Sequence, residues 1–266
     1  MRSRPQSGRH LARMSVRPVG RSVDMAMTAT ASAPHATEPA ASQHPPAPPR
    51  RHLSWLAVGV AVSFALPYVL ADRLGLPRDL YYGLYGAGVL ALCVGWMLDT
   101  GQSLRELVSR RVILAIGLGL VAAAASVAIV LATEDASSGP GGIELAGAVV
   151  WRGLFYGAID GLLLTAFPII VVYAALSESR LRRRKGGFAA VAVIALAASL
   201  VFTATYHLGY SDFRSARVRK PVTGDLIWAA PVIATANPIS APIAHAALHV
   251  TAVTHSYETD LFLPPH

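Results

Sequence analysis

The apolar residues of this chain are gathered into long stretches that short polar segments separate. Each stretch is close to the roughly 20 residues with which a helix crosses about 30 Å of hydrocarbon. The period-two alternation of a β-barrel does not occur in them. The pattern predicts an all-α fold, a polytopic membrane bundle of about six transmembrane helices within residues 51–266. The predicted spans are 53–71, 80–98, 112–133, 145–176, 188–209 and 237–256.

Two further segments do not fit this pattern. Residues 1–50 contain eight prolines and few bulky apolar residues, so they cannot bury enough surface to offset the entropy lost on ordering. We predict a disordered tail, which is retained because the first apolar stretch begins too late for a secretory signal peptide. Residues 226–236 are apolar but few, and they contain Pro231. We predict that they form a re-entrant or interfacial piece.

Composition supports a membrane protein, because 53% of the residues are hydrophobic and only 14% are charged. The formal net charge is +8, but the basic residues lie in blocks without interleaved aromatics, so no nucleic-acid partner is predicted. The lipid bilayer is the expected partner. Cys93 is the only cysteine and lies in an apolar stretch, which excludes an internal disulfide and predicts an inert buried thiol.

The Lys and Arg residues predict an orientation in the membrane. The tail and the loops on its side carry sixteen of them, against six in the loops of the other side. Cytoplasmic loops carry the excess of positive charge, so we expect a bacterial-type plasma membrane with the N-terminus in the cytoplasm. Residues 210–225 break the trend with four positive charges. Either this loop has a local role, or the helix count near it is wrong by one.

Titratable side chains within spans are candidates for function, because each costs about 2.5 to 3.5 kcal/mol at mid-bilayer on insertion scales. His245 and His249 are four residues apart, so on a helix they share a face, the spacing with which two histidines bind one divalent metal. His207 is expected to supply a third nitrogen. The alternative is that these histidines hydrogen-bond between helices. The full set is Glu144, Arg152, Asp160, His207, His245, His249 and His255.

Arg152 and Asp160 lie about 12 Å apart along a helix, so each is expected to meet a partner on another span. Asp160 either faces the histidines or neutralises a cation such as Arg152 or a protonated histidine. Gly153, Gly157 and Gly161 recur every four residues, a repeat that favours close packing of two helices.

Three segments contain most of these polar residues: GAVVWRGLFYG (147–157), SLVFTATYHLGY (199–210) and NPISAPIAHAALHVTAV (237–253). They resemble the motif helices of the CAAX protease and bacteriocin-processing (CPBP, or Abi) family of intramembrane metalloproteases, with a family-like core of about 144–255. The resemblance implies a metallopeptidase fold, bound zinc and a membrane-associated peptide or protein substrate. It places His207 and His245 at the family's histidine positions and His249 where the family has asparagine.

The chain departs from the family in the first motif, Glu-Glu-x-x-x-Arg. Arg152 matches the arginine, but Gly147 and Ala148 stand at the glutamate positions, and neither can take a proton from water. In one hypothesis the chain is an active metallopeptidase in which Glu144 or Asp160 replaces the glutamates.

In the other hypothesis it is a catalytically inactive member that serves as a binding or scaffold protein for a membrane partner, a lipid or a prenyl-like chain. A transporter is less favoured, because the sequence shows no internal repeat. The family assignment requires Arg152, His207 and His245 to converge on one pocket from three spans.

Overall fold

The computed structural model describes residues 47–258 and 262–264. The predicted disordered tail therefore lies almost wholly outside the described residues. The described part consists of helices and turns without a strand, which confirms the all-α prediction. Five of its helices are long and apolar enough to cross a membrane, so the chain is an integral membrane protein.

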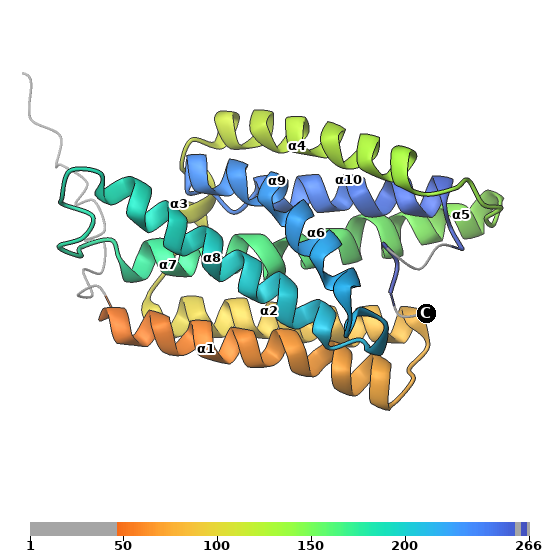
Figure 1. The fold of residues 1–266 in the computed structure, drawn as a ribbon, viewed down its shortest axis with the longest axis horizontal. Helices are drawn as coiled ribbons and strands as arrows, with labels where there is room; N and C mark the ends of the chain where they lie inside the picture. The colour runs from red at the N-terminus through yellow and green to blue at the C-terminus, as the bar shows by residue number, and fades with distance from the viewer. Residues whose placement is uncertain (1–46, 259–261, 265–266) are drawn as a thin grey trace, which may run out of the picture. The chain divides into compact units, whose positions relative to one another are not determined.

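The first two spans lie side by side as an antiparallel pair (Figure 1). Proline is favoured in the first helical turn because the amide it lacks would have no partner there, and the first helix does begin at Pro49. The second helix ends at Gly101, whose left-handed φ of 68° lets its amide bond to the Met97 carbonyl. The elements are α1 (Pro49–Leu66), the π-helical turn η1 (Pro67–Arg73) and α2 (Arg78–Thr100).

The third span is α4 (Val112–Thr133), which follows the short helix α3 (Leu104–Ser109). Its bounds agree with the predicted stretch 112–133. Figure 1 shows α4 at one edge of the bundle, next to α9 and α10, and it packs against both.

The fourth span is one continuous helical stretch of 34 residues at the centre of the bundle. In its most apolar window 83% of the residues are buried, against 17 to 44% for the other four spans. Two π-helical turns interrupt it, and such turns occur frequently at functional sites. It comprises α5 (Gly142–Ala148), η2 (Val149–Phe155), α6 (Tyr156–Gly161), η3 (Leu162–Ala166) and α7 (Phe167–Ala175).

The remaining elements complete the bundle and correct one prediction. Residues 226–236, expected to be re-entrant or interfacial, belong mostly to a regular helix that contains Pro231. The predicted span 237–256 is a helix of only 16 residues and is not one of the five candidate spans. The elements are α8 (Gly187–Leu208), the 3₁₀ turns η4 (Ser211–Phe213) and η5 (Ala216–Val218), α9 (Arg219–Thr235) and α10 (Ser240–His255).

The shortening of the last helix has a local cause. Ala236 takes a left-handed φ of 53° and ends α9. The side chain of Asn237 then accepts a hydrogen bond from the Ile239 amide and donates to the carbonyls of Val108 and Arg110. This turn uses residues 236–239, so α10 begins only at Ser240.

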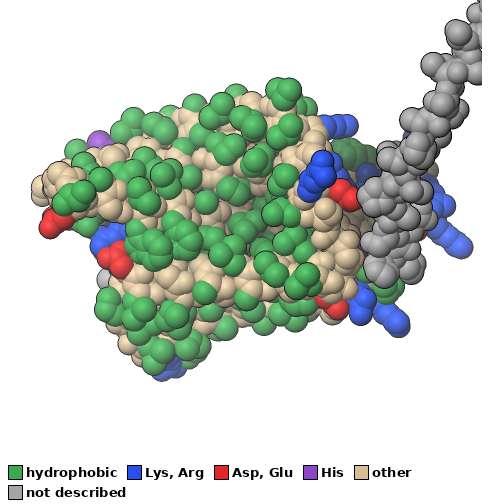
Figure 2. Space-filling view, turned by 180° about the vertical axis from the view of Figure 1, so that it is seen from behind, with side chains coloured by type: hydrophobic (Ala, Val, Ile, Leu, Met, Phe, Trp, Pro, Cys, Tyr) green, Lys and Arg blue, Asp and Glu red, His purple; other side chains and the backbone are tan. Residues whose placement is uncertain are grey.

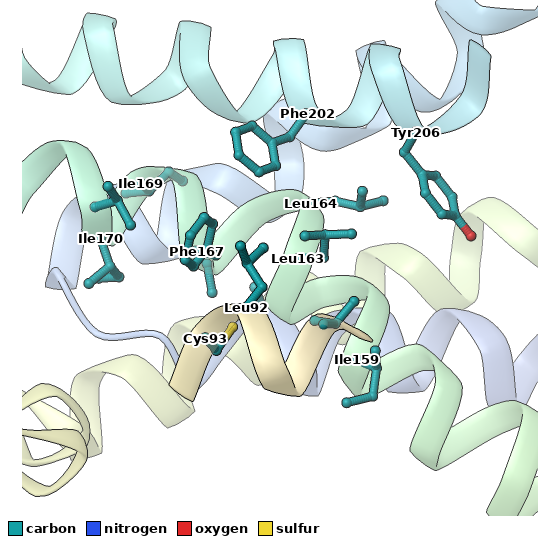
Figure 3. Close-up of a cluster of buried hydrophobic side chains, with 14 of the residues drawn as sticks. Leu92, Cys93, Ile159, Leu163, Leu164, Phe167, Ile169, Ile170, Phe202 and Tyr206 are labelled. Carbon is teal, nitrogen blue, oxygen red and sulfur yellow. The ribbon is translucent and has the colours of Figure 1, made fainter. Parts of the chain in front are cut away.

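The main apolar core lies between α1, α2, α7 and α8. Figure 3 shows Phe167 of α7 between Cys93 of α2 on one side and Phe202 of α8 on the other. Cys93 is a free, buried thiol, as predicted. A Cβ on Gly59 would lie 2.6 Å from the Phe202 ring, so the glycine lets α1 approach α8 closely.

The outer surface is apolar along the helices and charged at their ends. Figure 2 shows hydrophobic side chains over most of the visible face, with Lys and Arg side chains gathered towards the ends. One end carries the start of α1, helix α3 and the basic loop 180–185 between α7 and α8 (Figure 1). This distribution is the one expected of a bundle whose middle faces lipid.

Residues 219–225 of the basic segment 210–225 begin the helix α9, and Arg214 makes local contacts before it. Arg214 donates to the Asp72 carboxylate at 2.9 Å and to the carbonyls of Leu208 and Gly209. The guanidinium therefore satisfies carbonyls at the end of α8 and links this end to the π-helical turn η1.

Candidate metal site

Three glycines of the fourth span bring it into backbone contact with α10. A Cβ on Gly157 would lie 2.8 Å from the Ala246 Cα, and one on Gly161 would lie 2.6 Å from the Ala241 carbonyl oxygen. Gly153 meets Val250 in the same way. The repeat is thus a packing seam, as predicted, and α10 carries its histidines up to the face of α6 that carries Asp160.

Asp160, His245 and His249 form a buried cluster at this seam. Their exposed fractions are 5%, 1% and 3%. Asp160 Oδ2 lies 3.6 Å from His245 Nδ1 and 3.4 Å from His249 Nε2, and one ligand atom of each residue lies within 4.8 Å of the others. Ligand atoms around a tetrahedral ion with bonds near 2.0 to 2.1 Å are roughly 3.3 to 3.5 Å apart. The spacing therefore suits one shared ion.

Several nitrogens of this cluster have no hydrogen-bond partner among the described residues. They are Nδ1 of His245 and both ring nitrogens of His249. A buried polar atom left unpaired costs about 1 to 3 kcal/mol. A divalent cation bound by Asp160 Oδ2, His245 Nδ1 and His249 Nε2 would remove that cost for two of the three nitrogens. Two imidazoles and one carboxylate are also a common donor set for such ions.

Hydrogen bonds to neighbouring helices hold the two cluster atoms that face away from the proposed ion, Asp160 Oδ1 and His245 Nε2. Tyr85 of α2 donates to Asp160 Oδ1 at 3.0 Å. His245 Nε2 lies 3.3 Å from the hydroxyl of Thr165, which donates to Asp225 at 2.6 Å. Burial raises the pKa of Asp225, although hydrogen bonds from Ser199 and Thr165 act in the opposite direction. Such outer partners orient the ligands in known metal sites.

The cluster lines a cavity of about 510 Å³. Apolar side chains such as Ile129, Leu248 and Phe262 make up much of the wall. The exposed side chains of Arg219 and Lys220 line its outer part. The cavity therefore combines a polar cluster with a surface suited to an apolar ligand.

His207 lines the same cavity but does not belong to the group of three ligand residues. Its Nδ1 lies 2.7 Å from the Thr203 carbonyl oxygen. Because a carbonyl only accepts, Nδ1 carries the proton and Nε2 keeps its lone pair. The third position, for which His207 was expected, is occupied by Asp160.

Tyrosine hydroxyls form a hydrogen-bonded chain beside the cluster. Tyr156 and Tyr206 are joined at 2.5 Å, Tyr206 and Tyr210 at 2.8 Å, and Tyr210 and Tyr81 at 2.6 Å. The stretch YYGLY at 81–85 in a predicted span was the sequence signal for part of this chain, and it was missed. Asp225 was missed as well, although it directly precedes the apolar segment 226–236.

Arg152 does not reach this cavity, so the convergence with His207 and His245 that the family assignment requires is not found. Its guanidinium donates to both oxygens of Asp79 at 2.8 Å and to Tyr257 at 2.7 Å. Asp79, in the first turn of α2, offers a bidentate partner that holds Arg152 at the end of the bundle.

Glu144, the other catalytic candidate, lines a separate pocket with Arg152 and Tyr257. It is exposed and lies about 24 Å before Asp160 along the span, taking a rise of 1.5 Å per residue. His255 is also outside the cluster, where its Nε2 lies 3.2 Å from the Glu134 carbonyl oxygen. Of the predicted site residues, the structure gathers Asp160, His207, His245 and His249 and leaves the others apart.

Comparisons with protein-family models, with curated proteins and with solved structures found no match for this chain. The site is therefore interpreted from its own geometry.

Proposed function

We propose that this chain is a membrane-embedded metal-dependent hydrolase in which Asp160, His245 and His249 hold a divalent ion. The observation that carries the proposal is the set of buried, unpaired imidazole nitrogens that lie 3.4 and 3.6 Å from one carboxylate oxygen. Two histidines and one carboxylate form a ligand set of catalytic zinc, and zinc is the ion we propose. When bound, the ion would polarise a carbonyl and lower the pKa of water.

Residues around the cluster have the chemistry that such a reaction needs. His207 Nε2 has a free lone pair in the same cavity, which makes it the candidate general base in place of the missing glutamates. The hydroxyl of Tyr156, at one end of the tyrosine chain, lines the cavity and is a candidate donor to a substrate oxygen. Asp160 acts as a ligand in this proposal.

The substrate we propose is a membrane-associated peptide. The apolar cavity wall suits an apolar segment of such a peptide. The second candidate is a catalytically inactive protein that binds a membrane partner in the same cavity. It is favoured by the absence of a second carboxylate from the cluster of described ligand residues.

We further propose that the end with the basic loops at 105–111 and 180–185 faces the cytoplasm, together with the N-terminus. The excess of Lys and Arg at this end supports that orientation. A cysteine placed at Arg183 in a C93A background tests it. We expect no labelling by a membrane-impermeant maleimide in intact cells and full labelling after lysis.

Metal analysis of the purified protein tests the central proposal. In detergent, after zinc loading and desalting, we expect one equivalent of zinc in the wild type and none in the double variant His245→Ala, His249→Ala. His255→Gln, which alters a histidine of the same helix outside the cluster, is the matched control and should keep its zinc. Wild-type protein without stoichiometric metal would overturn the proposal.

Cleavage then separates the two candidate functions. A library of apolar peptides in detergent micelles is incubated with the zinc-loaded protein. Cleavage that a chelator stops and zinc restores supports the hydrolase. Stoichiometric zinc without cleavage of any peptide favours the binding protein.

A further inference from the structure

We infer that Thr165 and Asp225 form a hydrogen-bond relay that holds His245 in the tautomer whose Nδ1 is free to bind a metal. The inference rests on the proposed metal site and deepens it, because it names positioning residues behind one of the ligands. None of the sequence patterns pointed to either residue.

The three side chains come from three different elements and meet in a buried place. Thr165 lies on η3, Asp225 on α9 and His245 on α10, with exposed fractions of 0%, 0% and 1%. Thr165 Oγ1 lies 2.6 Å from Asp225 Oδ1 and 3.3 Å from His245 Nε2. The hydroxyl therefore stands between the carboxylate and the imidazole.

The direction of the relay follows from counting protons. A hydroxyl has a single hydrogen, and Thr165 gives it to Asp225. Towards His245 its oxygen can then only accept, so Nε2 must carry a hydrogen. A neutral imidazole has one N–H, which leaves Nδ1 with a free lone pair.

Ser199 keeps this direction the same when Asp225 is ionised and when Asp225 carries its proton on Oδ2. Its hydroxyl lies 2.6 Å from Asp225 Oδ2 and 3.0 Å from the Leu164 carbonyl oxygen. An ionised Asp225 accepts from both hydroxyls. A neutral Asp225 with its proton on Oδ2 donates to Ser199, whose own hydrogen then goes to Leu164. Oδ1 accepts from Thr165 in both cases.

The free Nδ1 faces the cluster. It lies 3.6 Å from Asp160 Oδ2 and has no hydrogen-bond partner among the described side chains. In the other tautomer an Nδ1–H would point at the Asp160 carboxylate and occupy the place of the ion. Thr165 thus prevents His245 from donating a hydrogen bond from Nδ1 to the Asp160 carboxylate.

Metal affinity tests the relay through matched variants. Thr165→Val removes the hydroxyl at nearly constant shape, and we expect zinc affinity to fall about 10- to 100-fold, the usual effect of losing an outer partner of a ligand. Thr165→Ser restores the hydroxyl and should bind nearly as the wild type does. Competition with a chromophoric chelator measures both, and thermal unfolding of the metal-free proteins confirms that they fold.

Asp225 provides a second pair of variants. The amide of Asp225→Asn can accept from Thr165 through its oxygen and donate to Ser199 through its nitrogen, so we expect zinc affinity close to that of the wild type. Asp225→Leu can do neither and should weaken zinc as Thr165→Val does. Equal zinc affinity of Thr165→Val and wild type would overturn the relay, as would equal weakening by Thr165→Ser and Thr165→Val.

A spectroscopic measurement needs no metal and separates the two proposals. In ¹⁵N-histidine NMR of the metal-free protein, with His245 assigned by His245→Gln, we expect the Nε2–H tautomer in the wild type and its loss in Thr165→Val. A wild type that binds no zinc overturns the proposed function but leaves this readout valid. A wild type that binds zinc but shows an Nδ1–H His245 in its metal-free form overturns the relay alone.

Discussion

Two polar sites on the fourth span differ in how completely their groups are paired. At Arg152 the guanidinium meets both oxygens of Asp79 and the hydroxyl of Tyr257, and the Asp79 side chain is 55% exposed. Eight residues further on, Asp160 is buried between two histidines that leave ring nitrogens unpaired. At the first site protein oxygens accept from the guanidinium, whereas at the second site three buried ring nitrogens have no hydrogen-bond partner among the described residues.

This difference distinguishes a structural polar site from a candidate functional site, which the residue types alone do not. Both sites contain a charged residue whose burial in lipid would be costly. Arg152 avoids the cost with a partner at the end of the bundle, which suits a structural role. The cluster at Asp160 keeps buried ring nitrogens without a hydrogen-bond partner among the described residues, which is the reason we propose a metal there.

The largest effect is expected from removing the acid of the unpaired site. Asp160→Asn keeps the shape but takes away the charge of a metal ligand, so zinc affinity should fall by roughly 100-fold or more, beyond the effect of an outer partner. Arg152→Gln is the matched change at the paired site and should stay within about threefold of the wild type. Chelator competition measures both, and equal losses would erase the contrast between the sites.

The next effect concerns the seam that brings the cluster together. Gly157→Ala places a Cβ 2.8 Å from backbone atoms of α10, and such overpacking costs about 1 to 3 kcal/mol. We expect a lower melting temperature in detergent and weaker zinc binding, since the histidines must move away from Asp160. Gly147→Ala is the control on the same span, because no atom lies within 4 Å of its added Cβ. A Gly157→Ala protein with unchanged melting and zinc affinity would contradict the role of the seam.

A smaller effect is expected at the paired site itself. Arg152→Met breaks the bidentate pair with the exposed Asp79 and should lower the free energy of unfolding by about 1 kcal/mol or less. Unfolding in detergent at low and high salt measures it, and the loss should shrink as salt screens the wild-type pair. Zinc affinity should not change. A loss of zinc in this variant would mean that the two sites are coupled.

The smallest effect is expected at Glu144. This exposed side chain lies far from the cluster, so Glu144→Gln should leave zinc affinity and any peptide cleavage unchanged and alter stability by less than about 0.5 kcal/mol. The same zinc and cleavage assays check it. Loss of cleavage with normal zinc content would restore Glu144 as the catalytic base and remove His207 from that role.

Part of the site was predictable from sequence because it depends on residues close together in the chain. The spacing of His245 and His249 places both on one helical face, and the glycine repeat from Gly153 predicts close packing. The partners of these groups were not predictable. Nothing local indicates that Arg152 meets Asp79, or that Thr165 stands between Asp225 and His245.

The sequence by itself determined that the chain forms apolar helices, where most of them begin and end, and that few polar side chains lie within them. The physical reason is that in lipid each segment must satisfy its own backbone hydrogen bonds, which makes helix formation a local matter. Only the tertiary structure decided which polar side chains meet. That outcome depends on how each helix is rotated, on the π-helical turns either side of Asp160, and on how closely the glycines let α10 approach.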